Sequence, residues 1–73
     1  MKFNVGDKVV VVRPVNEAMA TILGERFIVT AARMEYMGHI QEIEEVVFLE
    51  GKNGPFSSSQ FDLYEPITTL ENV

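Results

Sequence analysis

Short apolar runs separated by glycine-containing turns dominate the sequence. Residues 8–13 include four consecutive valines, residues 27–33 form a second run and residues 43–50 a third. Runs of this length, rich in β-branched and aromatic residues, are typical of strands. The glycines that precede or follow them supply turn conformations that other residues adopt only at a cost. The pattern therefore predicts an all-β fold with three principal strands.

The first connection differs in character from these runs. Pro14 ends the first strand because proline cannot donate a hydrogen bond to a ladder. Residues 14–23 contain alanine, methionine and leucine, and Asn16 is a suitable N-cap. This segment predicts a long loop with at most one or two helical turns.

The C-terminal third predicts shorter elements. A short strand begins at Phe56, residues 57–61 favour a single 3₁₀ turn, and residues 63–65 form a last strand. We expect one domain over residues 1–66 and a flexible tail over residues 67–73, where the pattern has no periodicity.

The central segment has two interpretations. In the first, Met37 and Gly38 form a two-residue hairpin turn, which pairs apolar with apolar residues and arginine with glutamate: Phe27 with Phe48, Ile28 with Val47, Val29 with Val46 and Arg33 with Glu42. In the second, residues 34–44 form a short helix with Tyr36, Ile40 and Ile43 on one side. The cross-strand pairs favour the hairpin.

The order of these elements resembles that of an SH3-like five-stranded barrel, and more narrowly the small SH3-like proteins that bacteriophages encode. Four short motifs carry the resemblance, which covers residues 3–65: Phe3-x-x-Gly6-Asp7-x-Val9-Val10, Gly24-x-x-Phe27-x-Val29, Val47-x-Leu49-Glu50-Gly51, and Phe56 with Gln60-Phe61-Asp62. Residues 34–45 exceed the usual hairpin tip of such proteins. The chain also lacks tryptophan, so it lacks the aromatic groove with which SH3 domains bind proline-rich peptides.

Composition and charge narrow the function further. The chain has 73 residues and no cysteine, which excludes disulfides and thiolate metal sites. Its longest uninterrupted apolar stretch is too short to span a bilayer, and it has no signal-peptide pattern, so we expect a cytoplasmic protein without membrane contact. Residues 1–33 carry five basic and three acidic side chains, whereas residues 34–73 carry one basic and eight acidic side chains. A net charge of −5 disfavours duplex nucleic acid as a partner.

Residues suited to catalysis are few. His39 is the only histidine, and with Glu42 it supplies two of the ligands that a metal site needs. The serines at 57–59 have no histidine base at a recognisable spacing, and residues 51–54 lack the ending of a phosphate-binding loop. We therefore expect no enzyme activity, no metal and no cofactor.

Residues 34–45, the segment that is longer than the usual hairpin tip, are the candidate binding site. Exposed methionine and tyrosine make adaptable contact surfaces, and a row of carboxylates attracts a basic partner. The alternatives are that the apolar residues cap the core and that the acidic ones only keep the protein soluble. The residues assigned to partner binding are the apolar anchors Met34, Tyr36, Met37 and Ile40 and the acidic rim Glu42, Glu44 and Glu45.

Three hypotheses follow for function. The first is a non-enzymatic module that binds a protein, and the phage resemblance implies a modulator or inhibitor of a host or defence protein, such as a nucleic-acid-handling enzyme. The second is a nucleic-acid-binding barrel whose contacts come from the basic residues of the N-terminal strands, Lys2, Lys8, Arg13, Arg26 and Arg33. The third is a self-associating structural protein, a homodimer that completes its core across a twofold axis.

Overall fold

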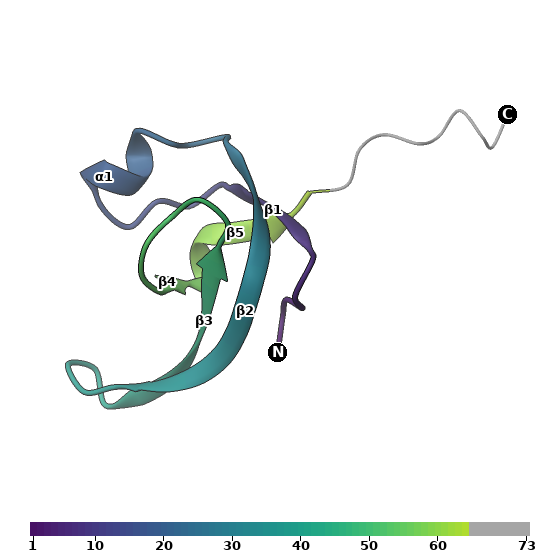
Figure 1. Cartoon of the computed structure of the whole chain (residues 1–73). Helices are drawn as coiled ribbons and strands as arrows, with labels where there is room; N and C mark the ends of the chain where they lie inside the picture. Colours follow the sequence, from purple (N-terminus) through teal and green to yellow (C-terminus); the bar gives the residue numbers. More distant parts are fainter. Residues whose placement is uncertain (65–73) are drawn as a thin grey trace, which may run out of the picture.

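The computed structural model describes residues 1–64, which form one antiparallel five-stranded sheet (Figure 1). The strands are β1 (Lys8–Val11), β2 (Arg26–Met37), β3 (Glu42–Leu49), β4 (Phe56–Ser57) and β5 (Phe61–Leu63), in the spatial order β4-β3-β2-β1-β5. The two helical segments in these residues are α1 (Glu17–Ala20) and the 3₁₀ turn η1 (Ser58–Gln60). Neither has the length or apolar character needed to cross a bilayer.

The all-β prediction is confirmed. The sheet curves strongly around one side, and β4 and β5 are its two edges (Figure 1). No pairing joins these two edges within residues 1–64, so the sheet is open. It is a curved antiparallel sheet with almost no helix.

The core lies on the concave side of this sheet. Val9 and Val11 alternate with more exposed neighbours along β1, which places every second side chain in the core. Phe61 on β5 has no exposed surface, and Met19 from α1 closes the core from the first loop. The buried cluster comprises Phe3, Val9, Val11, Met19, Val29, Val47, Leu49 and Phe61, with Ile22, Phe27, Ala32 and Phe56 packed against it.

Local sequence signals account for the connections. Asn16 caps α1, its side-chain oxygen accepting a hydrogen bond from the amide of Met19 at 2.9 Å. Gly24 then enters β2 with a φ of 85°, a conformation suited to glycine. The long first loop with one helical turn and the 3₁₀ turn are thus confirmed. The last strand spans Phe61–Leu63 rather than residues 63–65, because Phe61 is buried and pairs with Val11; Glu65 and the predicted tail lie outside the described residues.

The central segment is a hairpin, and the helical interpretation of residues 34–44 is wrong. The predicted register is also wrong. The loop contains four residues, 38–41, so Met37 pairs with Glu42 and Arg33 with Val46. A β-bulge between Val29 and Ala31 places Val29 opposite Leu49.

The observed register changes which residues of β3 lie in the core. In the regular register that pairs Val29 with Val46, Val47 and Leu49 point to the outside of the sheet. The observed register, with its bulge, places Val47 and Leu49 in the core on the same side as Val29, in the positions that the predicted register gives to Val46 and Phe48. Val46 is still only 1% exposed, on the other side of β3.

Candidate functional site

The distal half of the β2–β3 hairpin extends beyond the core (Figure 1). Ala32 and Val47 form the last cross-strand pair of the buried cluster, and Val46 in the next pair is buried on the opposite side of β3. Beyond the pair of Ala32 and Val47 the two strands continue through five further pairs, down to Met37 with Glu42. The sequence-predicted site of residues 34–45 therefore coincides with a hairpin arm, which we define as residues 33–46.

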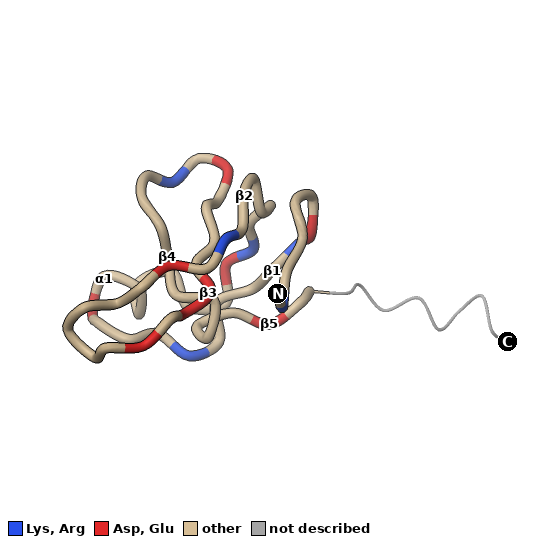
Figure 2. Tube along the Cα trace, turned by 90° about the horizontal axis from the view of Figure 1, so that it is seen from below, with Lys and Arg blue, Asp and Glu red and all other residues tan. Residues whose placement is uncertain are grey.

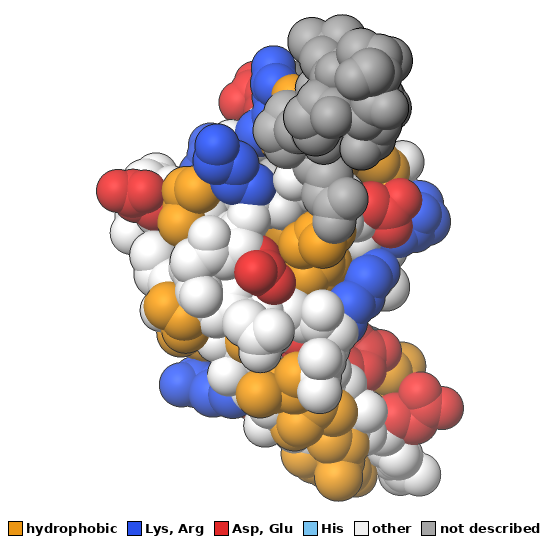
Figure 3. Space-filling model, turned by 90° about the vertical axis from the view of Figure 1, so that its right-hand side faces the viewer, with side chains coloured by type: hydrophobic (Ala, Val, Ile, Leu, Met, Phe, Trp, Pro, Cys, Tyr) orange, Lys and Arg blue, Asp and Glu red, His pale blue; other side chains and the backbone are white. Residues whose placement is uncertain are grey.

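One face of the hairpin arm carries an apolar strip. Tyr36 pairs directly with Ile43, and Met34 lies two residues before Tyr36, so the three side chains share the face that begins at Ala32 and Val47. The residues are 65%, 65% and 51% exposed, respectively. Hydrophobic side chains gather at this lower end of the molecule in the space-filling view (Figure 3). We call Met34, Tyr36 and Ile43 the apolar strip.

The predicted apolar anchors do not all lie on this strip. Met37 lies on the opposite face and is half-buried, and Ile40 lies in the four-residue loop, 42% exposed. Ile43, which the strip includes, was not among the residues assigned from the sequence. Its place beside Tyr36 depends on the pairing register, which apolar patterning alone did not determine.

The opposite face of the hairpin arm is acidic. Glu35 pairs with Glu44, and Glu42 lies further toward the tip. Like charges in directly opposed positions repel, and two neighbours reduce this repulsion. The Nε of Arg33 donates to Glu35, and the hydroxyl of Ser57 donates to Glu44 at 3.3 Å. Red segments in Figure 2 follow the hairpin.

Glu45 has a different environment from the other carboxylates. It lies beside Met34, and its two oxygens accept hydrogen bonds from the amides of Lys2 and Phe3 at 2.7 and 2.9 Å. Partial burial raises the pKa of Glu45, but hydrogen bonds from those amides and from Ser58, together with the N-terminal charge, lower it more, so the net pKa lies below its ordinary value. These hydrogen bonds attach the N-terminal segment to β3.

The basic residues of the N-terminal strands divide into two groups. Arg13 donates to Asp62 at 2.7 Å, Lys2 lies 3.7 Å from the same carboxylate, and Arg33 is bonded to Glu35. The guanidinium of Arg13 lowers the pKa of Asp62. Lys8 and Arg26 have no carboxylate within 4 Å in residues 1–64. Blue segments lie beside β1 and β2 in Figure 2.

The residues considered for catalysis do not converge. His39 is exposed in the hairpin loop, and residues 1–64 contain no group of three or more histidine or carboxylate side chains placed to hold a metal. A hollow of about 330 Å³ between the first loop and η1 has no charged lining residue: it is lined by Val15, Asn16, Ala18, Met19, Pro55, Phe56, Ser57 and Gln60. Within the described residues, neither place supplies an acid–base pair.

Comparison of the chain with family models, curated proteins and solved structures finds no match.

Proposed function

We propose that this chain is a non-enzymatic protein-binding module with an SH3-like barrel architecture, a bacteriophage-encoded modulator or inhibitor of a host or defence protein. The fold assignment is supported by the order of elements: strand, long loop, hairpin, short strand, 3₁₀ turn and last strand. The phage origin rests on the resemblance of four short motifs.

The apolar strip is the observation that carries the proposed activity. Tyr36 and Ile43 are each 65% exposed on an arm that lies beyond the core, and the adjacent Met34 adds a flexible, polarisable side chain. Exposed tyrosine and aliphatic groups in one patch are typical anchors of interfaces. The strip therefore inserts into an apolar depression of the partner.

The carboxylates on the other face define the partner's charge. Glu35, Glu42 and Glu44 lie on the face opposite the strip, and Arg33 forms an ion pair with Glu35. A partner with basic residues beside an apolar depression matches this arrangement, as in a nucleic-acid-handling enzyme. Attraction between the two surfaces accelerates association, and salt weakens it.

The test is affinity capture with a matched pair of variants. Tyr36→Ser/Ile43→Ser removes the strip, and the control Val15→Ser/Leu23→Ser removes two residues of similar exposure from the first loop. We expect the control to retain the proteins captured from bacterial lysate and the strip variant to lose them, with at least about tenfold weaker binding of a purified partner. Thermal unfolding establishes that both variants fold. Equal capture by the two variants contradicts the proposal.

A second copy of the chain is the competing occupant of the strip. Light scattering on the wild type and on Tyr36→Ser/Ile43→Ser separates the two cases. We expect a monomer for both. A wild-type dimer that the substitutions dissociate favours self-association and contradicts binding of a foreign protein through this surface.

A further inference from the structure

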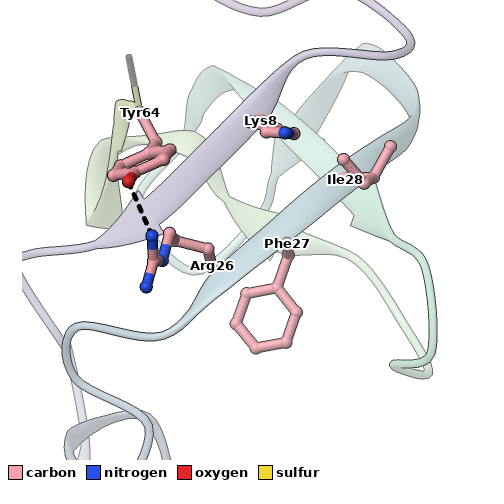
Figure 4. A pocket seen from close by; sticks show the side chains of 5 residues that line it. All are labelled: Lys8, Arg26, Phe27, Ile28 and Tyr64. Carbon is pink, nitrogen blue, oxygen red and sulfur yellow. Dashed lines mark hydrogen bonds between the residues drawn. The ribbon is translucent and has the colours of Figure 1, made fainter. Parts of the chain in front are cut away.

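A shallow cavity lies at the other end of β2, on the outer side of the sheet (Figure 4). Its volume is about 220 Å³, and it is lined by Lys8, Arg26, Phe27, Ile28 and Tyr64. Lys8 pairs with Ile28, and the amide of Tyr64 donates to the carbonyl of Lys8 at 2.8 Å. These three residues thus lie in one row across β2, β1 and the end of β5. Lys8 is exposed while its neighbour Val9 is buried, which places this row opposite the core.

Arg26 and Tyr64 lie against each other at one side of the cavity, and we call this pair the platform. The guanidinium carbon of Arg26 lies 4.6 Å from the centre of the Tyr64 ring, and its Nη1 donates to the Tyr64 hydroxyl at 2.6 Å (Figure 4). The cation–π contact and the hydrogen bond together hold the guanidinium in place. A planar cation on an aromatic ring is a surface on which nucleobases stack.

The charge around the cavity favours an anion. Asp62 pairs with Val10 in the next row of the same face, and it is matched by Arg13 and Lys2. Lys8 and Arg26 have no such partner within residues 1–64. The five lining residues include two basic side chains and no acidic one, although the whole chain carries −5. Lys8 is therefore available for a phosphate while Arg26 faces the base.

We propose that this cavity binds one nucleotide of a single strand of nucleic acid, with the base on the Arg26–Tyr64 platform and its phosphate at Lys8. The volume is below the roughly 300–1,000 Å³ of sites that enclose a drug-sized ligand, so the cavity holds one unit of a polymer. Duplex DNA binds poorly because its bases are stacked internally and the net charge repels it.

Fluorescence anisotropy with a labelled short oligodeoxythymidylate at low salt tests this site. We expect Lys8→Gln/Arg26→Gln to weaken binding at least about tenfold, whereas Arg33→Gln, which removes one cation from the hairpin arm, leaves it unchanged. One neutralised phosphate, at Lys8, predicts a slope of log K against log[salt] of about −0.7. Equal losses for the two variants, or wild-type binding by the double variant, overturn the proposal.

Further experiments distinguish stacking of the base from attraction by charge. Arg26→Lys keeps the charge and removes the planar group, so we expect weaker oligonucleotide binding and unchanged binding of inorganic phosphate. A 5′-mononucleotide that shifts the NMR signals of the cavity residues as strongly as the oligonucleotide identifies the free nucleotide as the ligand and contradicts the strand. Competition by oligoglutamate as effective as that by the oligonucleotide overturns the nucleotide assignment. These outcomes are separate from those of the apolar strip, because no variant touches it.

Discussion

Glu45→Gln tests whether a single carboxylate fastens the N-terminal segment to the sheet. The carboxylate accepts two amide hydrogen bonds, from Lys2 and Phe3, and the segment buries Phe3 in the core. Glutamine keeps one acceptor and presents an NH₂ group to the other amide, so one charge-assisted bond is lost. Hydrogen bonds to charged groups contribute about 1.5–3 kcal/mol. The bond from Lys2 is exposed and that from Phe3 partly buried, which favours the lower end, about 1.5 kcal/mol.

The assay is thermal and urea unfolding, with Glu42→Gln as the matched control. Glu42 lies on the same strand, is exposed and has no hydrogen-bond partner among the described side chains. For a domain of this size 1 kcal/mol corresponds to about 4–8 °C in Tm, so Glu45→Gln lowers Tm by about 6–12 °C. We expect Glu42→Gln to stay within about 0.5 kcal/mol of the wild type.

The pH dependence gives an independent check. Because folding lowers the pKa of Glu45, its contribution is complete above the unfolded carboxyl pKa of about 4.3 and is lost as pH falls through the folded-state value. The stability difference between wild type and Glu45→Gln therefore shrinks on acidification below about pH 5. Equal Tm values for Glu45→Gln and Glu42→Gln at pH 7, or a difference that persists at strongly acidic pH, refute the reasoning.

Two further substitutions test the core and the hairpin loop. Phe61→Ala removes a ring with no exposed surface, so we expect a loss of about 3–5 kcal/mol in urea unfolding; a loss below 1 kcal/mol contradicts its place in the core. Gln41 has a φ of 56°, which costs a non-glycine residue about 1–2 kcal/mol, partly offset by the greater backbone entropy of glycine. Gln41→Gly therefore stabilises by about 0.5 kcal/mol, and a clear destabilisation contradicts the loop geometry.

Local signals predicted more of this fold than long-range ones did. The Asn16 cap and the 3₁₀ turn depend on neighbours within a few residues, so the sequence was sufficient for them. The register of β2 with β3 includes a bulge between Val29 and Ala31, which brings Val29, Val47 and Leu49 to the same side of the sheet. Strand propensities and pairing preferences do not indicate where such a bulge lies.

The sequence indicated which segment forms the candidate site, but not which of its side chains share a face. Residues 34–45 do form an arm beyond the core, but the face of each side chain follows from the register. Ile43 was therefore missed, and Met37 was grouped with Tyr36 although the two lie on opposite faces. The bonds of Glu45 to Lys2 and Phe3 join residues more than forty positions apart, which no local pattern indicates.

The two proposed surfaces lie far enough apart to act independently. Arg26 and Tyr36 lie ten positions apart in β2, and at about 3.3 Å per residue this is roughly 30 Å along the strand. The cavity is on the outer face near β1 and β5, whereas the apolar strip continues the core face of the hairpin. Substitutions separated by more than about 10 Å without shared contacts are usually additive. We therefore expect a partner bound at the strip to leave the cavity open, so that the two proposed activities do not exclude each other.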